Sequence, residues 1–247
     1  MTLLEEKTFW TEYAHNVEHY IHYDEHEYQI IVGLLRLADS ALVGKRVLEI
    51  GCGTGVWTKN LAALGAEVYP FDLSAEIVTV ARATTHPTKI SGFVADMHHI
   101  PFAEQTFDYV FGSMVVHHTT DHIAFGREVA RVLKSGGRAV FHENSARNPL
   151  LMFARKILVG RFGIPKNSSP GEHPLQPAEI QQFGRAFNTS RVFYGRMFLF
   201  QLAVKYLLKR ESGSVFDFAR ILDNWLYAKA NKLRAMTYYQ ILCLEKD

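Results

Sequence analysis

The chain has 247 residues, of which 48% are hydrophobic and 13% aromatic, and its formal net charge is +2 at pH 7. This length and apolar content suit one globular α/β domain, and the dispersed charge gives no reason to expect nucleic acid as a partner. Two cysteines without metal or disulfide spacing, no signal-peptide pattern and no membrane-spanning stretch predict a cytoplasmic protein without stable membrane insertion.

Two amphipathic helices are predicted before the first strand. Apolar residues recur at helical spacing over about residues 5 to 21, with aromatic side chains on one face. Asp24 and Glu27 have the spacing of a capping box and predict a second helix to about Ala38. Four histidines lie between positions 15 and 26, but the break near Asp24 prevents one continuous face, so no metal site is predicted.

A strand, a glycine-rich loop and a helix are predicted next. Val47 to Ile50 is typical of a buried strand, and Gly51, Gly53 and Gly55 can take backbone angles closed to other residues. The free N–H groups at the start of such a helix favour polar or anionic groups, so we expect a nucleotide-like ligand. The dinucleotide fingerprint G-x-G-x-x-G needs a small residue where Val56 stands, which argues against NAD.

The run E-I-G-C-G-T-G resembles motif I of the class I S-adenosylmethionine (SAM)-dependent methyltransferases, and further matches to this family follow in order to about residue 145. The resemblance is to the small-molecule, type 11-like members. It implies an α/β fold with a Rossmann-like seven-stranded sheet, parallel but for the last strand, and a helical cap. It also implies SAM as the cofactor, bound by residues of this run: Glu49, Gly51, Cys52, Gly53 and Gly55.

The second strand is predicted at Glu67 to Phe71 and ends at Asp72 and Leu73. An acidic side chain at this edge, facing the glycine loop, can accept two hydrogen bonds from ribose hydroxyls. We assign this role to Asp72 and place Leu73 beside it in the cofactor site. The alternative, that Asp72 only starts the next helix, is weakened because Ser74 is available as the N-cap.

The edges of the third and fourth strands complete the expected cofactor site. The third strand, Phe93 to Ala95, is followed by Asp96 and Met97. The resemblance implies that this pair holds the adenine, with the carboxylate accepting from the exocyclic amine and the apolar side chain on the ring. Ser113 and Met114, at the end of the fourth strand, would flank the sulfonium and the methyl group.

Titratable groups follow the fourth and fifth strands, where the methyl group must emerge. His117 and His118 follow the fourth strand, and Glu143 lies at the edge of the fifth strand, Arg138 to His142. Between the two strands a helix is expected to run to Leu133, with Gly136 and Gly137 ending it. A neutral histidine here could act as general base for a hydroxyl, so His117, His118 and Glu143 are the candidate catalytic residues. Alternatively, the His-His pair packs structurally, as is common in the resembled family.

The remaining segments are predicted to form a helical cap on one domain of residues 1–247. They cover about residues 1–40, 148–177 and 195–234, and either pack on the sheet as core or form a lid over an aromatic-lined pocket. Lysines and arginines between positions 205 and 234 give a basic face, either solvated or meeting an anionic or membrane-associated substrate. The candidate acceptor-lining residues are Tyr13, Tyr20, Tyr23, Phe200 and Trp225.

The predicted function is methyl transfer from SAM to a small aromatic or apolar acceptor, with O-methylation favoured. The alternatives are N- or C-methylation of a small molecule or lipid-like substrate, and a non-catalytic SAM-binding protein. An NAD(P)-dependent oxidoreductase is disfavoured by the early third glycine and by Asp96. A nucleic-acid methyltransferase is disfavoured because no N-P-P-Y-like motif follows the fourth strand.

Overall fold

The computed structural model describes residues 5, 7–9, 11, 25–36, 42–85, 90, 92–161, 172–195 and 199–247. Its strands are β1 (Arg46–Ile50), β2 (Glu67–Asp72), β3 (Phe93–Val94), β4 (Phe107–Ser113), β5 (Leu133–Asn144), β6 (Thr189–Tyr194) and β7 (Tyr239–Glu245). Its α-helices are α2 (Glu25–Arg36), α3 (Val56–Ala63), α4 (Ala75–Thr85), α5 (His122–Val132), α6 (Pro149–Leu158), α7 (Pro177–Phe183), α8 (Leu199–Leu207) and α9 (Ser214–Lys229). The 3-10 helices are η1 (Val116–His118), η2 (Gly184–Ala186) and η3 (Asn231–Met236).

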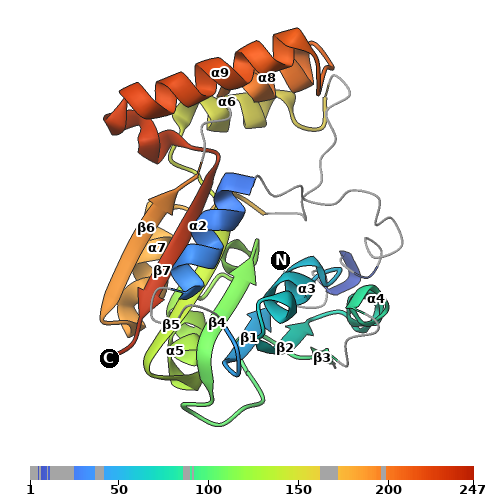
Figure 1. Ribbon diagram of the computed structural model, residues 1–247, viewed down its shortest axis with the longest axis vertical. Coiled ribbons are helices and arrows are strands. Elements are labelled where there is room, and N and C mark those ends of the chain that lie inside the picture. The colour runs from blue at the N-terminus through green and yellow to red at the C-terminus, as the bar shows by residue number, and fades with distance from the viewer. Residues whose placement is uncertain are drawn as a thin grey trace.

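One sheet of seven strands, in the order β3-β2-β1-β4-β5-β7-β6, forms the centre of the molecule (Figure 1). β1 pairs in parallel with β2 and β4, β2 with β3, and β4 with β5. β7 alone is antiparallel to both of its neighbours, β5 and β6. The predicted fold class, a mostly parallel seven-stranded sheet with an antiparallel last strand, is confirmed.

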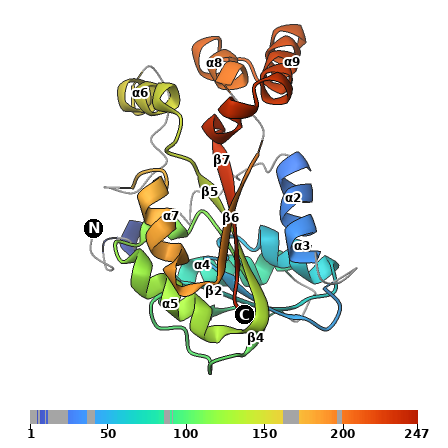
Figure 2. The ribbon, with the colours of Figure 1, turned by 90° about the vertical axis from the view of Figure 1, so that its left-hand side faces the viewer.

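Helices cover both faces of the sheet, and each face has its own core (Figure 2). On one face Phe141 of β5 packs against Phe125 of α5 and Phe183 of α7, with ring centroids 6.1 and 5.1 Å apart. On the other face Trp57 of α3 lies 4.7 Å from Phe111 of β4. Successive strand residues point to opposite faces, so buried strands with apolar residues on both faces fix this three-layer arrangement.

The predicted helix to Leu133 agrees with α5, which ends at Val132, but the expectation that Gly136 and Gly137 end it is wrong. β5 begins at Leu133, directly after α5, so Gly136 and Gly137 lie inside the strand. The pairing of β4 with β5 shifts register between Phe107 and Tyr109, and Gly136 has a φ of 74°. An irregular stretch of this kind needs a positive φ that glycine adopts without strain, which explains the glycine pair.

Helices α6, α8 and α9 stand beyond the carboxyl end of β5 and the start of β7 (Figures 1 and 2). Asn148 begins α6, because its Oδ1 accepts from the N–H groups of Leu150 and Leu151 at 3.1 and 3.2 Å and Pro149 follows it. Its Nδ2 also donates to the carbonyl of Met236 at 2.8 Å, which ties α6 to η3. Within the described part of the chain, no helix has the length and apolar character needed to cross a bilayer.

Two glycine substitutions test how α5 packs on α7. A Cβ at Gly126 of α5 would overlap the carbonyl oxygen of Phe183, whereas a Cβ at Gly33 of α2 would have nothing within 4 Å. We expect Gly126→Ala to lower the free energy of unfolding by about 1–3 kcal/mol and Gly33→Ala to raise it by about 0.5–1 kcal/mol. Urea denaturation measures both, and a Gly126→Ala variant as stable as the wild type would contradict the packing.

Candidate functional site

The predicted cofactor residues meet at one edge of the sheet. From β1 the chain adds β2 and β3 on one side of the sheet and then returns to add β4 and β5 on the other side of β1. The topological switch point of the sheet therefore lies between β1 and β4. Ligands of open α/β sheets bind outside the carboxyl ends of the strands at such a point. At the carboxyl ends of β1 to β4 stand Glu49, Gly51, Cys52, Gly53, Gly55, Asp72, Leu73, Asp96, Met97, Ser113 and Met114.

The glycine loop after β1 has the backbone that only glycines adopt readily, with φ of 68° at Gly51, 50° at Gly53 and 82° at Gly55. A Cβ at Gly51 would lie 3.2 Å from Cγ2 of Val115, and one at Gly55 would lie 3.1 Å from the carbonyl oxygen of Ala81. A Cβ at Gly53 would have nothing within 4 Å. Two glycines therefore permit close packing, and the third leaves the loop open where a ligand would approach.

Asp72 faces the glycine loop from the end of β2. Its Oδ2 accepts from the N–H of Gly53 at 3.1 Å, and its Oδ1 accepts from the N–H of Ser74 at 3.3 Å. Burial raises the pKa of this carboxyl, although these N–H groups favour its ionised form. A carboxylate has further lone pairs, so Asp72 can still accept from the hydroxyls of a ribose. Its contact with a ribose stays a prediction.

Glu49 and Cys52 support the loop from its buried side. Glu49 is 2% exposed and accepts from the hydroxyl of Thr58 in α3 at 2.6 Å. Burial raises its pKa to about 8, so this carboxyl is largely neutral near pH 7. Burial also raises the pKa of the Cys52 thiol, which makes it a packing residue and not a nucleophile.

Asp96 lies just after the short strand β3, at the edge of the site. Its Oδ1 accepts from the N–H of His98 at 2.9 Å, and its Oδ2 lies 3.2 Å from Nδ1 of the exposed His99. Met97 packs at the margin of the buried cluster under the sheet edge. An adenine amine at Asp96 would therefore compete only with an exposed imidazole, and the predicted contact stays a prediction.

A buried carboxylate holds the turn that follows β4. Glu143, 0% exposed at the end of β5, accepts at Oε1 from the N–H groups of Val115 and Val116 at 2.8 and 2.7 Å. Its Oε2 lies 2.5 Å from Nδ1 of His117. We call this set of contacts the Glu143 clamp. It uses both carboxylate oxygens, so Glu143 has a structural task that the predicted catalytic role did not anticipate.

His117 is held between two carboxylates. Its Nε2 lies 3.3 Å from Oε1 of Glu172, opposite its contact with Glu143. Burial disfavours a charged imidazole, but the two carboxylates outweigh it and raise the pKa of His117 to about 10. Burial raises the pKa of Glu143, but the charge of His117 and the hydrogen bonds from His117, Val115 and Val116 together outweigh burial and lower it. A protonated imidazole cannot accept a further proton, so this arrangement disfavours His117 as a base, and its catalytic role stays a prediction.

The imidazole of His118 lies against that of His117. The two ring centroids are 4.2 Å apart with planes inclined by 37°. Within the described residues, His117, His118 and Glu172 form the group that could hold a metal ion, since their ligand atoms lie within 4.8 Å of one another. The predicted absence of a metal stays a prediction.

Sequence reasoning missed Glu172. It precedes His173-Pro174, between the helices α6 and α7, and reaches His117 from a part of the chain that follows no strand. A single glutamate in a loop carries no periodic or motif signal. Only the folded chain brings it to the end of β4.

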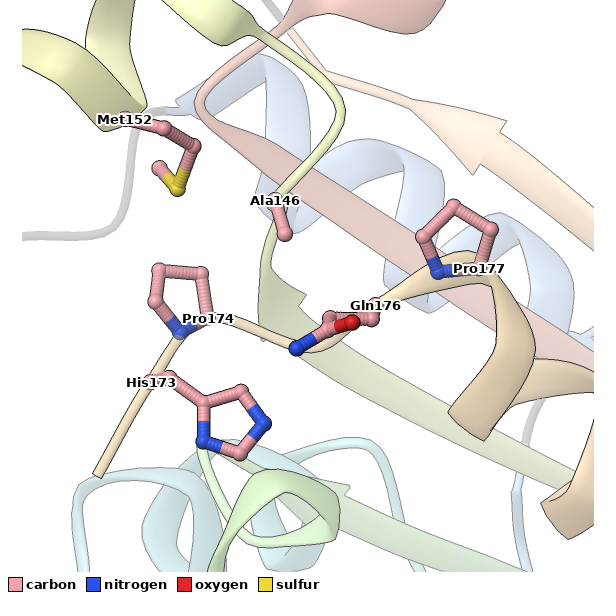
Figure 3. A pocket seen from close by; sticks show the side chains of 6 residues that line it. All are labelled: Ala146, Met152, His173, Pro174, Gln176 and Pro177. Carbon is pink, nitrogen blue, oxygen red and sulfur yellow. The ribbon is translucent and has the colours of Figure 1, made fainter. Parts of the chain in front are cut away.

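A cavity of about 290 Å³ lies between the end of β5, α6 and the start of α7 (Figure 3). The predicted acceptor residues Phe200 and Trp225 do not line it and are 37% and 59% exposed. Tyr13, Tyr20 and Tyr23 lie outside the described residues. The cavity is lined by Ala146, Met152, His173, Pro174, Gln176 and Pro177.

The clamp predicts a pH-dependent loss of stability on substitution of His117. The folded protein keeps the proton of His117 up to about pH 10, whereas the unfolded chain loses it near 6.5. The ion pair thus contributes fully below pH 6.5, and its contribution falls by about 1.4 kcal/mol per pH unit as the pH rises toward 10. His117→Gln should cost about 3–5 kcal/mol at pH 6, because it leaves a buried carboxylate without its cation.

Urea denaturation between pH 6 and 10 measures this effect, with His99→Gln as the control at an exposed histidine. The gap in stability between the wild type and His117→Gln should narrow as the pH rises. A gap that stays constant would show that His117 is neutral in the folded protein.

Comparison with known proteins agrees with the resemblance. Residues 48–141 match the family model described as "Methyltransferase domain". The chain is 35% identical over 187 residues to the biotin biosynthesis bifunctional protein BioHC of Cellvibrio japonicus, covering 69% of this chain and 36% of that protein. It is 33% identical over 146 residues to the ubiquinone biosynthesis O-methyltransferase of Xanthomonas oryzae, covering 56% of this chain and 60% of that one.

The chain thus spans less than two thirds of the length of either relative. Among solved structures, an S-adenosylmethionine-dependent methyltransferase from Mesorhizobium loti superposes with a TM-score of 0.57 at 18% identity, covering 89% of this chain and 97% of that one. This likeness supports the fold alone. With the ordered motifs, the family model shows that residues 48–141 form a methyltransferase domain, and this part of the chain belongs to the class I SAM-dependent methyltransferases.

Proposed function

We propose that this protein transfers a methyl group from SAM to an oxygen of a small, apolar or aromatic acceptor. The observation that carries the proposal is the set of residues at the carboxyl ends of β1 to β4. There an open glycine loop and the Asp72 carboxylate face each other, as a bound nucleoside requires. The family membership supplies SAM as the cofactor.

The residues present fit this cofactor. Gly53 leaves open space in front of the loop, Asp72 offers acceptor oxygens for ribose, and Asp96 offers one for the adenine amine. When bound, SAM supplies a methyl group on a sulfonium sulfur that is already a good leaving group. The protein's part is then chiefly alignment of the acceptor with the methyl group, which needs few reactive side chains.

The acceptor site proposed here is the cavity beside α6 and α7. At about 290 Å³ it is at the lower limit for small-molecule sites, so it suits a small acceptor. His173 lines it, and the neighbouring Glu172 contacts His117 after β4, so the cavity adjoins the end of the sheet where the methyl group is expected. The relative named as a ubiquinone biosynthesis O-methyltransferase favours oxygen as the methylated atom.

His118 is the proposed proton acceptor for an acceptor hydroxyl. The Glu143 clamp occupies both oxygens of Glu143 and keeps His117 charged, so neither is suited to remove a proton at neutral pH. His118 follows directly in η1 and lies near Asp72, so it borders the cofactor end of the site. Of the three candidate catalytic residues, His118 is therefore the one that we propose as the base.

Replacement of Asp72 tests cofactor binding. Asp72→Asn keeps the size of the side chain but removes the charge that strengthens hydrogen bonds from ribose. We expect SAM affinity to fall by about 1.5–3 kcal/mol. Thermal stability without ligand should also fall somewhat, because the amide nitrogen of Asn cannot accept from the backbone N–H that one carboxylate oxygen of Asp72 accepts from. Calorimetry with SAM and S-adenosylhomocysteine measures affinity, and Asp121→Asn at the N-cap of α5 is the matched control. Unchanged affinity in Asp72→Asn would refute the ribose assignment.

Replacement of His118 tests proton removal. Mass detection of methyl gain, with a panel of phenols, carboxylic acids, amines and lipid analogues, first identifies an accepted substrate. His118→Gln should then lower turnover by about 10²–10⁴-fold and alter the pH profile while SAM affinity is retained. Full turnover in this variant would point to an amine, an ionised acid or a carbon as the methylated group. No methyl gain with any acceptor, despite SAM binding, would favour the non-catalytic alternative.

A further inference from the structure

Three helices beyond the sheet edge expose apolar stripes in place of the usual polar outer face. In each helix the stripe follows the spacing i, i+3, i+7, which places its residues on one side. Apart from Ala203, which is also exposed, the stripe residues are between 37% and 65% exposed. The stripes are Leu150, Phe153 and Ile157 on α6, Phe200, Ala203 and Leu207 on α8, and Phe218, Ile221 and Trp225 on α9.

The opposite side of α9 is the side that packs. Ala219 and Asp223 are 3% and 0% exposed, and the Asp223 carboxylate accepts from the N–H groups of Phe200 and Gln201 at 3.0 and 2.9 Å. A buried carboxylate thus caps the N-terminus of α8 and fixes α8 on α9. The contact between α8 and α9 therefore does not involve the outward apolar residues of α9, which form a separate, exposed surface.

The segments that contain these helices carry a net positive charge, whereas the rest of the chain is net negative. Residues 148–161 and 199–236 contain ten Lys and Arg against three Asp and Glu, which gives them +7, whereas the whole chain carries +2 and the rest therefore −5. Of the three acidic residues, Asp223 is buried, Glu211 pairs with Lys205 at 3.2 Å and Asp217 pairs with Arg220 at 2.8 Å. A strongly basic surface with exposed Trp, Phe, Leu and Ile combines the two features of helices that lie in a membrane interface.

We propose that the outward faces of α6, α8 and α9 bind the surface of an anionic phospholipid bilayer. The apolar stripes enter the boundary between headgroups and acyl chains, and the surrounding lysines and arginines meet the lipid charges. All three helices stand at the same end of the molecule, so they can approach one surface (Figures 1 and 2). None of the described helices is fit to cross the bilayer, so the contact is interfacial.

A second copy of the chain fits this surface less well than a bilayer does. Face-to-face association would bring two surfaces of charge +7 together, and like charges at such an interface are unfavourable. A neutral protein partner would use the apolar stripes but would leave the positive charge without a counterpart. The bilayer matches both, and the proposal does not depend on methyl transfer.

Vesicle sedimentation with the full chain tests the proposal without any methyl donor. We expect binding to vesicles of equal parts phosphatidylcholine and phosphatidylglycerol, and at least about tenfold weaker binding to phosphatidylcholine alone. Phe218→Ser and Trp225→Ser should each weaken binding on the order of tenfold, because an aromatic side chain leaves the interface. Lys156→Gln and Lys229→Gln should each weaken it about fivefold.

Matched controls lie outside these helices. Val43, which is 73% exposed in the turn before β1, and Arg127, which is exposed on α5, test an apolar and a charged side chain away from the proposed surface. Val43→Ser and Arg127→Gln should bind vesicles as the wild type does. All variants alter exposed side chains and should retain affinity for S-adenosylhomocysteine, which separates a lost membrane contact from a lost cofactor site.

The fluorescence of Trp225 reports the depth of contact. The emission should shift to the blue on addition of anionic vesicles, and Trp225→Phe should lose this shift while it still binds. The proposal is overturned if the wild type does not sediment with anionic vesicles, or if it binds neutral vesicles equally well. It is also overturned if the stripe variants bind vesicles as well as the controls do. A wild type that does not bind vesicles but self-associates, with self-association lost in the stripe variants, would show that the surface binds a second copy of the chain.

Discussion

The Glu143 carboxylate is the contact on which the geometry of the site depends. By accepting from the N–H groups of Val115 and Val116 it fixes the turn after β4, where Met114 takes a φ of 56° that is unusual for a side chain. The side chain of Val115 then packs against Gly51 and Gly112. Its methyl carbons lie 3.2 and 2.7 Å from where a Cβ on these two glycines would stand, so neither position has room for a side chain. A buried charge at β5 thereby sets the glycine loop after β1, two strands away in the sheet.

The sequence predicted the parts of this site that follow from local pattern. Each cofactor residue comes directly after a strand, and parallel strands place their carboxyl ends at one edge, so Asp72 and Gly53 could be brought together before the fold was known. The acid-base roles could not be predicted in the same way. Whether His117 is a base or a cation depends on Glu172, which arrives from a loop without any pattern, and on burial that only packing creates.

The helices beyond the sheet are a second feature that the sequence could predict only in part. Phe200 and Trp225 have the helical spacing of a packed face, and the sequence predicted that they line a pocket. In the fold, Asp223 and Ala219 take the packed side of α9, and the aromatic residues turn outward. The spacing of residues identifies which of them share a helix face. Whether that face is buried or exposed depends on which other helix packs against it, and the spacing does not contain this information.

Nitrogen-15 NMR of the His117 imidazole tests the clamp most directly. Both ring nitrogens should carry a proton at pH 7 and above, because Glu143 and Glu172 each face one of them. The same state should persist when S-adenosylhomocysteine is bound, since the clamp forms within the protein. A single protonated nitrogen at pH 7 would mean that His117 is neutral, and the account of a charged clamp shaping the site would then be wrong.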